Sequence, residues 1–195
     1  MRLPVLAAAA ALTVLVTAAP SALAGPTVSA DLDLGTSIGR DLAPSPGPSG
    51  AAPTSLLYIA GFRIRAGWRF SLGPLLLVPE IGGGYDVQRF SGAPDGSLPR
   101  VFVGGRGGLS LPVLPLVRFE PGLYGHIGYA PGTGPGLAND VGLALDLRLL
   151  RFLLVGAHVG YEVVTRWLSA APFSSGTVAI ADRWIGYGVH AGVVF

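Results

Sequence analysis

The chain has 195 residues, of which 50% are hydrophobic and 12% charged, with a formal net charge of +2 at pH 7. This length suits one domain, the small net charge excludes a nucleic-acid footprint, and the lack of cysteine excludes disulfides and thiolate metal sites. Beyond the N-terminus no run approaches the roughly 20 apolar residues of a spanning helix, which leaves a closed β-barrel as the way to cross a bilayer.

The first 24 residues have the pattern of a secretory signal peptide. Arg2 precedes an apolar run over residues 3–16, and Ala22-Leu23-Ala24 forms a small-x-small cleavage site. We expect cleavage before Gly25, so that residues 25–195 form the mature domain outside the cytoplasm.

Eight segments then alternate apolar and polar residues with the period of two that is typical of strands. They cover residues 28–38, 60–70, 75–89, 99–111, 116–129, 139–149, 152–164 and 183–195. Each has at least about the 9–11 residues of a tilted transmembrane strand. The pattern predicts an all-β fold, an eight-stranded antiparallel up-and-down transmembrane β-barrel.

The connections alternate between short and long. The short ones are residues 71–74, 112–115 and 150–151, and the long ones are residues 39–55, 90–98, 130–138 and 165–182. Outer-membrane barrels have short periplasmic turns and long external loops. We therefore expect both termini on the periplasmic side and an extracellular ligand, if there is one, at loops 39–55 and 165–182.

The polar face of the strands carries eight acidic and seven basic residues, and the apolar face carries no charge at its centre. Buried charges persist when they are paired, and glycine-rich positions suit a narrow interior. The polar face should therefore line the lumen. We predict a lumen ion-pair network of Asp31, Asp33, Arg63, Arg65, Glu80, Asp86, Arg106, Arg118, Glu120, Asp146, Arg148, His158, Glu162 and His190.

Aromatic residues gather at the ends of the apolar face, as expected at the two membrane interfaces. The predicted aromatic girdle consists of Trp68, Phe70, Tyr85, Phe119, Tyr129 and Tyr161.

With these features the sequence resembles the small outer-membrane β-barrels of Gram-negative bacteria of the OmpA/OmpX type. The resemblance implies contact with outer-membrane lipid and lipopolysaccharide, and with the barrel-assembly machinery and periplasmic chaperones during biogenesis. It also implies an assembly signal in the last strand, formed by Tyr187, Val189, Ala191, Val193 and Phe195.

No catalytic, cofactor or metal motif stands out. The glycine runs lack the Gly-Lys-Ser/Thr ending of a phosphate loop. Closure of the barrel would bring Asp31, His190 and His158 together, which is a hypothesis for a reactive site; we favour an internal polar network. The expected role is structural or one of surface interaction, with a narrow pore for small solutes or a lipid A-modifying enzyme as alternatives.

Overall fold

The computed structural model describes residues 23–42, 56–91, 95–131, 135–169 and 177–195. Within them the secondary structure is strand throughout: β1 (Leu23–Leu42), β2 (Leu56–Leu72), β3 (Leu75–Phe90), β4 (Gly96–Leu109), β5 (Leu111–Leu114), β6 (Val117–Tyr129), β7 (Gly136–Leu149), β8 (Leu153–Ser169) and β9 (Thr177–Val194). The described part of the chain holds no helix with the length and hydropathy needed to span a membrane.

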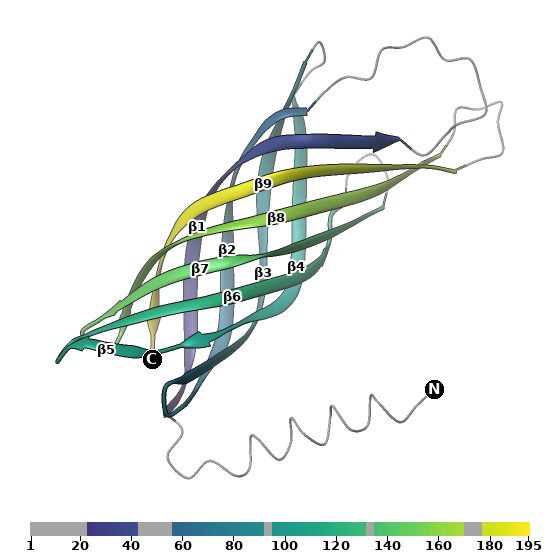
Figure 1. Ribbon diagram of the computed structural model, residues 1–195. Helices are drawn as coiled ribbons and strands as arrows, with labels where there is room; N and C mark the ends of the chain where they lie inside the picture. The colour runs from purple at the N-terminus through teal and green to yellow at the C-terminus, as the bar shows by residue number, and fades with distance from the viewer. Residues whose placement is uncertain (1–22, 43–55, 92–94, 132–134, 170–176) are drawn as a thin grey trace, which may run out of the picture.

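The strands close into one antiparallel barrel. Consecutive strands pair within the series β1, β2, β3, β4 and within the series β6, β7, β8, β9, and β1 pairs with β9. β5 continues the line of β4 beyond Ser110, and both pair with β6, which closes the wall. The nine elements thus form eight wall strands, tilted around a common axis (Figure 1), and the predicted eight-stranded barrel is confirmed.

Alternation along the strands sorts the side chains into two environments. In β1, Asp31 is 3% exposed and its neighbour Leu32 is 67% exposed. The same alternation continues in β3, where Glu80 and Asp86 are buried while Ile81 and Tyr85 are exposed. Because side chains alternate across a strand, the wall carries an apolar outer face and a polar lumen.

The short turns gather at one end of the barrel. Gly73 takes a φ of +61° between β2 and β3, and Leu150 and Arg151 take φ values of 52° and 73° between β7 and β8. A positive φ suits a tight reversal, and it is unusual for residues other than glycine. This end, here called the turn end, also holds β5 and the end of β9 (Figure 1).

At the opposite end, the loop end, several strands run further than the alternation predicted. β8 and β9 pair up to Ser169 and Thr177, and Leu42 of β1 still pairs with Ile180 of β9. The predicted loop boundaries at 39–55 and 165–182 were therefore wrong at their paired ends. Backbone hydrogen bonds extend the ladder without any need for amphipathic side chains. Residues 43–55 and 170–176 of the two predicted loops lie outside the described part.

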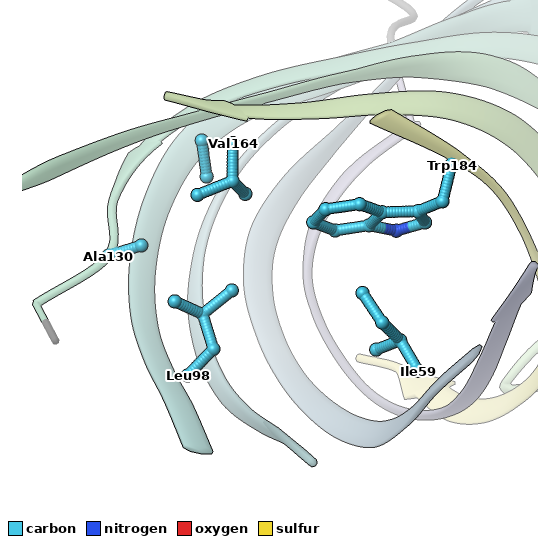
Figure 2. Close-up of a cluster of buried hydrophobic side chains, with 6 residues drawn as sticks. Ile59, Leu98, Ala130, Val164 and Trp184 are labelled. Atoms are coloured by element: carbon cyan, nitrogen blue, oxygen red, sulfur yellow. The ribbon is translucent and has the colours of Figure 1, made fainter. Parts of the chain in front are cut away.

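An apolar cluster fills the lumen at the loop end. It comprises Ile59, Leu98, Ala130, Ala138, Val164 and Trp184, with Phe90 packed against it. Figure 2 shows the labelled side chains converging toward the barrel axis from different strands. Trp184 is 1% exposed. We call this group the apolar cap.

Candidate functional site in the barrel lumen

Below the apolar cap, arginines cross the lumen to carboxylates on other strands. Arg63 of β2 contacts Asp33 at 3.1 Å, Asp140 at 2.8 Å and Glu162 at 2.7 Å. Arg100 of β4 forms ion pairs with Asp86 and again with Glu162. One glutamate from β8 therefore links β2 and β4 through the interior.

A second layer of ion pairs lies closer to the turn end. Arg65 contacts Asp31 at 2.5 Å and Glu80 at 3.3 Å. Arg106 contacts Asp146 at 2.6 Å and Glu80 at 3.5 Å. All five side chains are buried, so charge pairing offsets the cost of removing them from water.

The three histidines are built into the same layers. His126 lies between two carboxylates, with Nδ1 at 2.7 Å from Asp140 and Nε2 at 2.8 Å from Glu80. Nε2 of His158 lies 2.7 Å from Asp33, and Nε2 of His190 lies 2.6 Å from Asp146. The His158 and His190 rings stack with centroids 5.7 Å apart.

Glycines leave the space that the larger lumen side chains occupy. A Cβ atom on Gly160 would collide with the Tyr124 hydroxyl, and one on Gly142 would lie 2.7 Å from the same ring. The Tyr124 ring also contacts His126 and His158. Tyr124 therefore lies over glycines of the next two strands, Gly142 of β7 and Gly160 of β8.

The turn end has a different charge balance. Arg69 donates two hydrogen bonds to Glu120, at 2.7 and 2.6 Å. Arg148 lies 3.2 Å from the same carboxylate, and Arg118 donates to Ser110. These arginines line a cavity of about 860 Å³ at the turn end. We call it the turn-end cavity.

Among the described residues, the ion pairs in the middle of the lumen and the charged residues at the turn end carry opposite excess charge. The central network has seven carboxylates (Asp31, Asp33, Glu80, Asp86, Asp140, Asp146 and Glu162) and four arginines (Arg63, Arg65, Arg100 and Arg106), an excess of three negative charges before the histidines are counted. The ion-pair group at the turn end has one side-chain carboxylate, Glu120, and three arginines, Arg69, Arg118 and Arg148; Arg151 and the last residue, Phe195, also line the cavity there. The lumen is therefore polarised along its axis.

The structure places every residue of the predicted network on the lumen side and brings most of them into direct pairs. Arg118 is the exception, since it bonds Ser110. Four residues outside the predicted network join it: Arg69, Arg100, His126 and Asp140. All four lie on the polar face that the sequence predicted to line the lumen; their pairing with the network was not predicted.

The inward direction of Trp184 follows from its parity, but the apolar cap as a group was not predicted. Leu98 has the parity of Arg100, Ala138 that of Asp140, and Val164 that of Glu162. These residues point inward because strand geometry fixes the direction of a side chain whatever its polarity. The rule that apolar residues face outward fails for the whole cluster at the loop end, and also for single buried residues elsewhere in the barrel, such as Val78 and Phe102.

The residues of the predicted girdle and assembly signal lie as follows. Trp68, Tyr85, Tyr129 and Tyr161 are exposed on the outer face, and Phe70 and Phe119 are half-buried. In β9, Tyr187, Val189 and Ala191 are exposed and Val193 is half-buried. Phe195 is 75% exposed, and its backbone N–H donates to Pro26 of β1.

No protein-family model matches the sequence, and no curated protein matches it either. The fold, however, is similar to solved structures. The outer membrane protein OprG from Pseudomonas aeruginosa aligns over 88% of this chain and 96% of its own, with a TM-score of 0.56 and 8% identity. This chain has the fold of an outer-membrane β-barrel protein.

Neisserial surface protein A (NspA) also aligns with the barrel, over 90% of this chain and 99% of its own, with a TM-score of 0.46 and 13% identity. At such identities the likeness to OprG establishes the barrel fold alone. What this barrel does has to be argued from its own lumen and its two ends.

Proposed function

We propose that the protein is an integral outer-membrane barrel with a closed lumen, which acts as a structural or surface-interaction protein through its loop end. The observation that carries this proposal is the filled interior. Cross-lumen ion pairs and the apolar cap occupy it, and the voids among these residues hold about 10 Å³ each. That is about the volume available to one water molecule.

Its placement in the outer membrane is supported by the outer face. Large apolar residues such as Leu123, Leu143 and Val189 are more than half exposed at mid-strand, where lipid would cover them. In this proposal residues 1–24 direct export and are removed. The last strand is read by the barrel-assembly machinery, with periplasmic chaperones before it.

The loop end supports a surface role because three strands that reach it are longer than a membrane crossing requires. β1, β8 and β9 have 20, 17 and 18 residues, whereas about 9–11 cross the bilayer. Near this end Trp167 is exposed on β8. The parts of β8, β9 and β1 that extend above the lipid would offer backbone groups and side chains to a partner.

Topology can be tested with epitope tags on intact Gram-negative cells. A tag within residues 43–55 should react with antibody added outside, whereas a tag between Gly73 and Pro74 should react only after the envelope is opened. The reverse pattern would place the loop end in the periplasm and overturn the proposal.

Conductance separates a closed barrel from a pore. The refolded protein should give no steady conductance in a planar bilayer while it shows the gel mobility shift of a folded barrel on heating. A steady, voltage-stable current from protein that passes this folding check would reject the closed lumen and favour the narrow pore.

The surface role is tested by replacing residues 43–55 and 170–176 with Gly-Ser segments of equal length. The replacement should fold normally, because the ion pairs of the lumen are untouched. We expect cells carrying it to lose deoxycholate tolerance or adhesion to collagen-coated plates relative to cells with the parent barrel. If both remain unchanged, the loop end does not carry the function.

A further inference from the structure

Two histidines and an aspartate converge inside the barrel where its first and last strands meet. Nδ1 of His158 on β8 lies 3.5 Å from Nδ1 of His190 on β9, and Nδ1 of His190 lies 3.8 Å from Oδ1 of Asp31 on β1. One ligand atom from each residue lies within 4.8 Å of the other two. Asp31 and His190 are direct partners across the β1–β9 seam.

The partners of the histidines decide which nitrogen atoms are free. Nε2 of His158 faces Asp33 at 2.7 Å, and Nε2 of His190 faces Asp146 at 2.6 Å. A carboxylate accepts, so each Nε2 carries the hydrogen and donates it, which leaves a lone pair on each Nδ1 of the neutral rings. Two lone pairs that face each other at 3.5 Å need a positive charge between them, which a shared proton or a bound metal ion can supply.

This arrangement is the one seen around metal-bound imidazoles. A histidine that binds a metal through one nitrogen usually donates its other N–H to a carboxylate, which fixes the ring. Here both rings have that carboxylate, supplied by separate strands, β1 and β7. The carboxylate of Asp31 is held in turn by Arg65, at 2.5 Å.

The spacing matches a small tetrahedral ion. With Zn–N bonds of about 2.0–2.1 Å, two ligands of a tetrahedral site stand about 3.4 Å apart, close to the 3.5 Å between the two Nδ1 atoms. The Asp31 oxygen lies 3.8 Å from Nδ1 of His190 and within 4.8 Å of the His158 ligand atom, so on binding it has to move toward His158 by up to about 1.4 Å. A void of about 10 Å³ borders all three residues, which is room for about one water as a fourth ligand.

The wall has glycines where these rings need space. Gly156 lies opposite His190, and Gly188 lies opposite His158. A Cβ atom on Gly156 would lie 2.6 Å from Nε2 of His190, and one on Gly188 would lie 2.7 Å from Cε1 of His158. The stacked pair is therefore accommodated by the backbone itself.

We propose that His158, His190 and Asp31 bind one divalent transition-metal ion, Zn²⁺ in the first instance, inside the lumen. Two imidazole nitrogens and a carboxylate oxygen are a ligand set that suits Zn²⁺. The ion joins β8, β9 and β1 at the seam that closes the barrel, and its charge offsets two of the three excess negative charges of the central network. By cross-linking these three strands the ion stabilises the closed barrel, whatever the loops bind.

The test compares four chains refolded in detergent after treatment with EDTA: the parent, His158→Asn, His190→Asn and His126→Gln. His126 is the matched control, because both its ring nitrogens already face carboxylates. After incubation with micromolar ZnSO₄ and desalting, the parent and His126→Gln should retain about one Zn²⁺ per folded chain. Each of the other two variants should retain less than about a tenth of that.

Asp146→Asn removes the carboxylate that orients the His190 ring and should weaken zinc binding about 10–100-fold. Zn²⁺ should also raise the urea midpoint of the parent, because an ion that binds only the folded barrel stabilises it. Gel mobility before and after heating shows which variants are folded. Should a histidine variant fail to fold, ¹⁵N-histidine NMR of the parent reports whether the two Nδ1 atoms become metal-bound.

Two results would overturn the site. One is a folded parent that retains less than about half a Zn²⁺ per chain and shows no change at its histidine Nδ1 atoms. The other is an equal loss of zinc in His126→Gln, which would mean that the metal binds the lumen charges without these three ligands.

Discussion

Replacing Glu120 by glutamine is the sharpest test of how the lumen charges hold the barrel together. Glu120 is 2% exposed. Its oxygens accept from Arg69 at 2.7 and 2.6 Å and from the Ser110 hydroxyl at 2.6 Å, and Arg148 lies at 3.2 Å. Glutamine keeps the volume but removes the one carboxylate among the turn-end arginines.

The expected cost follows from what is left behind. Breaking a buried ion pair by neutralising one partner usually costs about 3–5 kcal/mol, because the other charge stays buried. Here Arg69 loses both hydrogen bonds to a negative group, while the turn-end cavity lets water reach the half-buried Arg148. We therefore expect a loss near the lower end, about 3 kcal/mol.

The measurement is urea unfolding of the refolded barrel, followed by tryptophan fluorescence and extrapolated to water. The control is Asp95→Asn, which breaks the exposed pair with Arg89, 3.0 Å long with side chains 52% and 44% exposed. Surface pairs of this kind contribute about 0.2–1 kcal/mol. A second control, Arg69→Met with Glu120→Met, should lose less than Glu120→Gln alone, because the buried charge of Arg69 is removed with its partner and only the half-buried Arg148 loses a carboxylate.

The reasoning fails if Glu120→Gln unfolds at the same urea concentration as Asp95→Asn. That outcome would mean that solvation by water, and not the Glu120 carboxylate, stabilises the charges of the turn-end arginines in the folded barrel.

Two further predictions test how the lumen is packed. Gly160→Val should yield little folded barrel by gel mobility, because its side chain would occupy the place of the Tyr124 hydroxyl and overpacking costs about 1–3 kcal/mol or more; Gly39→Ala, where a Cβ meets nothing within 4 Å, should fold like the parent. In single-tryptophan chains in vesicles, brominated lipid should quench Trp68, which is exposed on the outer face, and leave Trp184 of the apolar cap bright. Equal quenching of the two would contradict the assignment of inside and outside.

The side to which each residue points could be predicted from the sequence, because a strand turns alternate side chains to opposite faces. Asp31, Arg65 and Glu162 were expected in the lumen and lie there, buried. The same parity also contained Leu98 and Val164, but their apolar character hid them. Polarity was taken as the guide to direction, whereas the backbone sets direction first.

The pairing partners could be predicted only along the wall. The antiparallel register of β1 and β9 made a contact between Asp31 and His190 foreseeable, and the structure pairs them directly. Contacts across the lumen were not foreseeable. Arg63 reaches Glu162, 99 residues away, because the curvature of the closed wall brings β2 and β8 within reach of a long side chain.

Strand ends were the least predictable feature. Amphipathic alternation reports where a strand meets lipid and lumen, and it stops where both faces meet water. The β8–β9 ladder nevertheless continues to Ser169 and Thr177, because its backbone groups still bond one another. The two histidines, which were expected to come together where the barrel closes, are not direct partners: each faces a glycine and they meet on a diagonal.

The apolar cap narrows the lumen at the loop end, and the turn-end cavity leaves it open at the other end. Ile59, Leu98 and Trp184 close the loop end of the lumen with side chains that are apolar apart from the indole N–H of Trp184, while the turn end widens among arginines. A small anion that diffuses in from the wide side meets a favourable potential first and the carboxylate-rich middle next, and it must retreat by the route it entered. In the described part of the chain, the turn-end cavity is the side from which water has room to reach the lumen side chains.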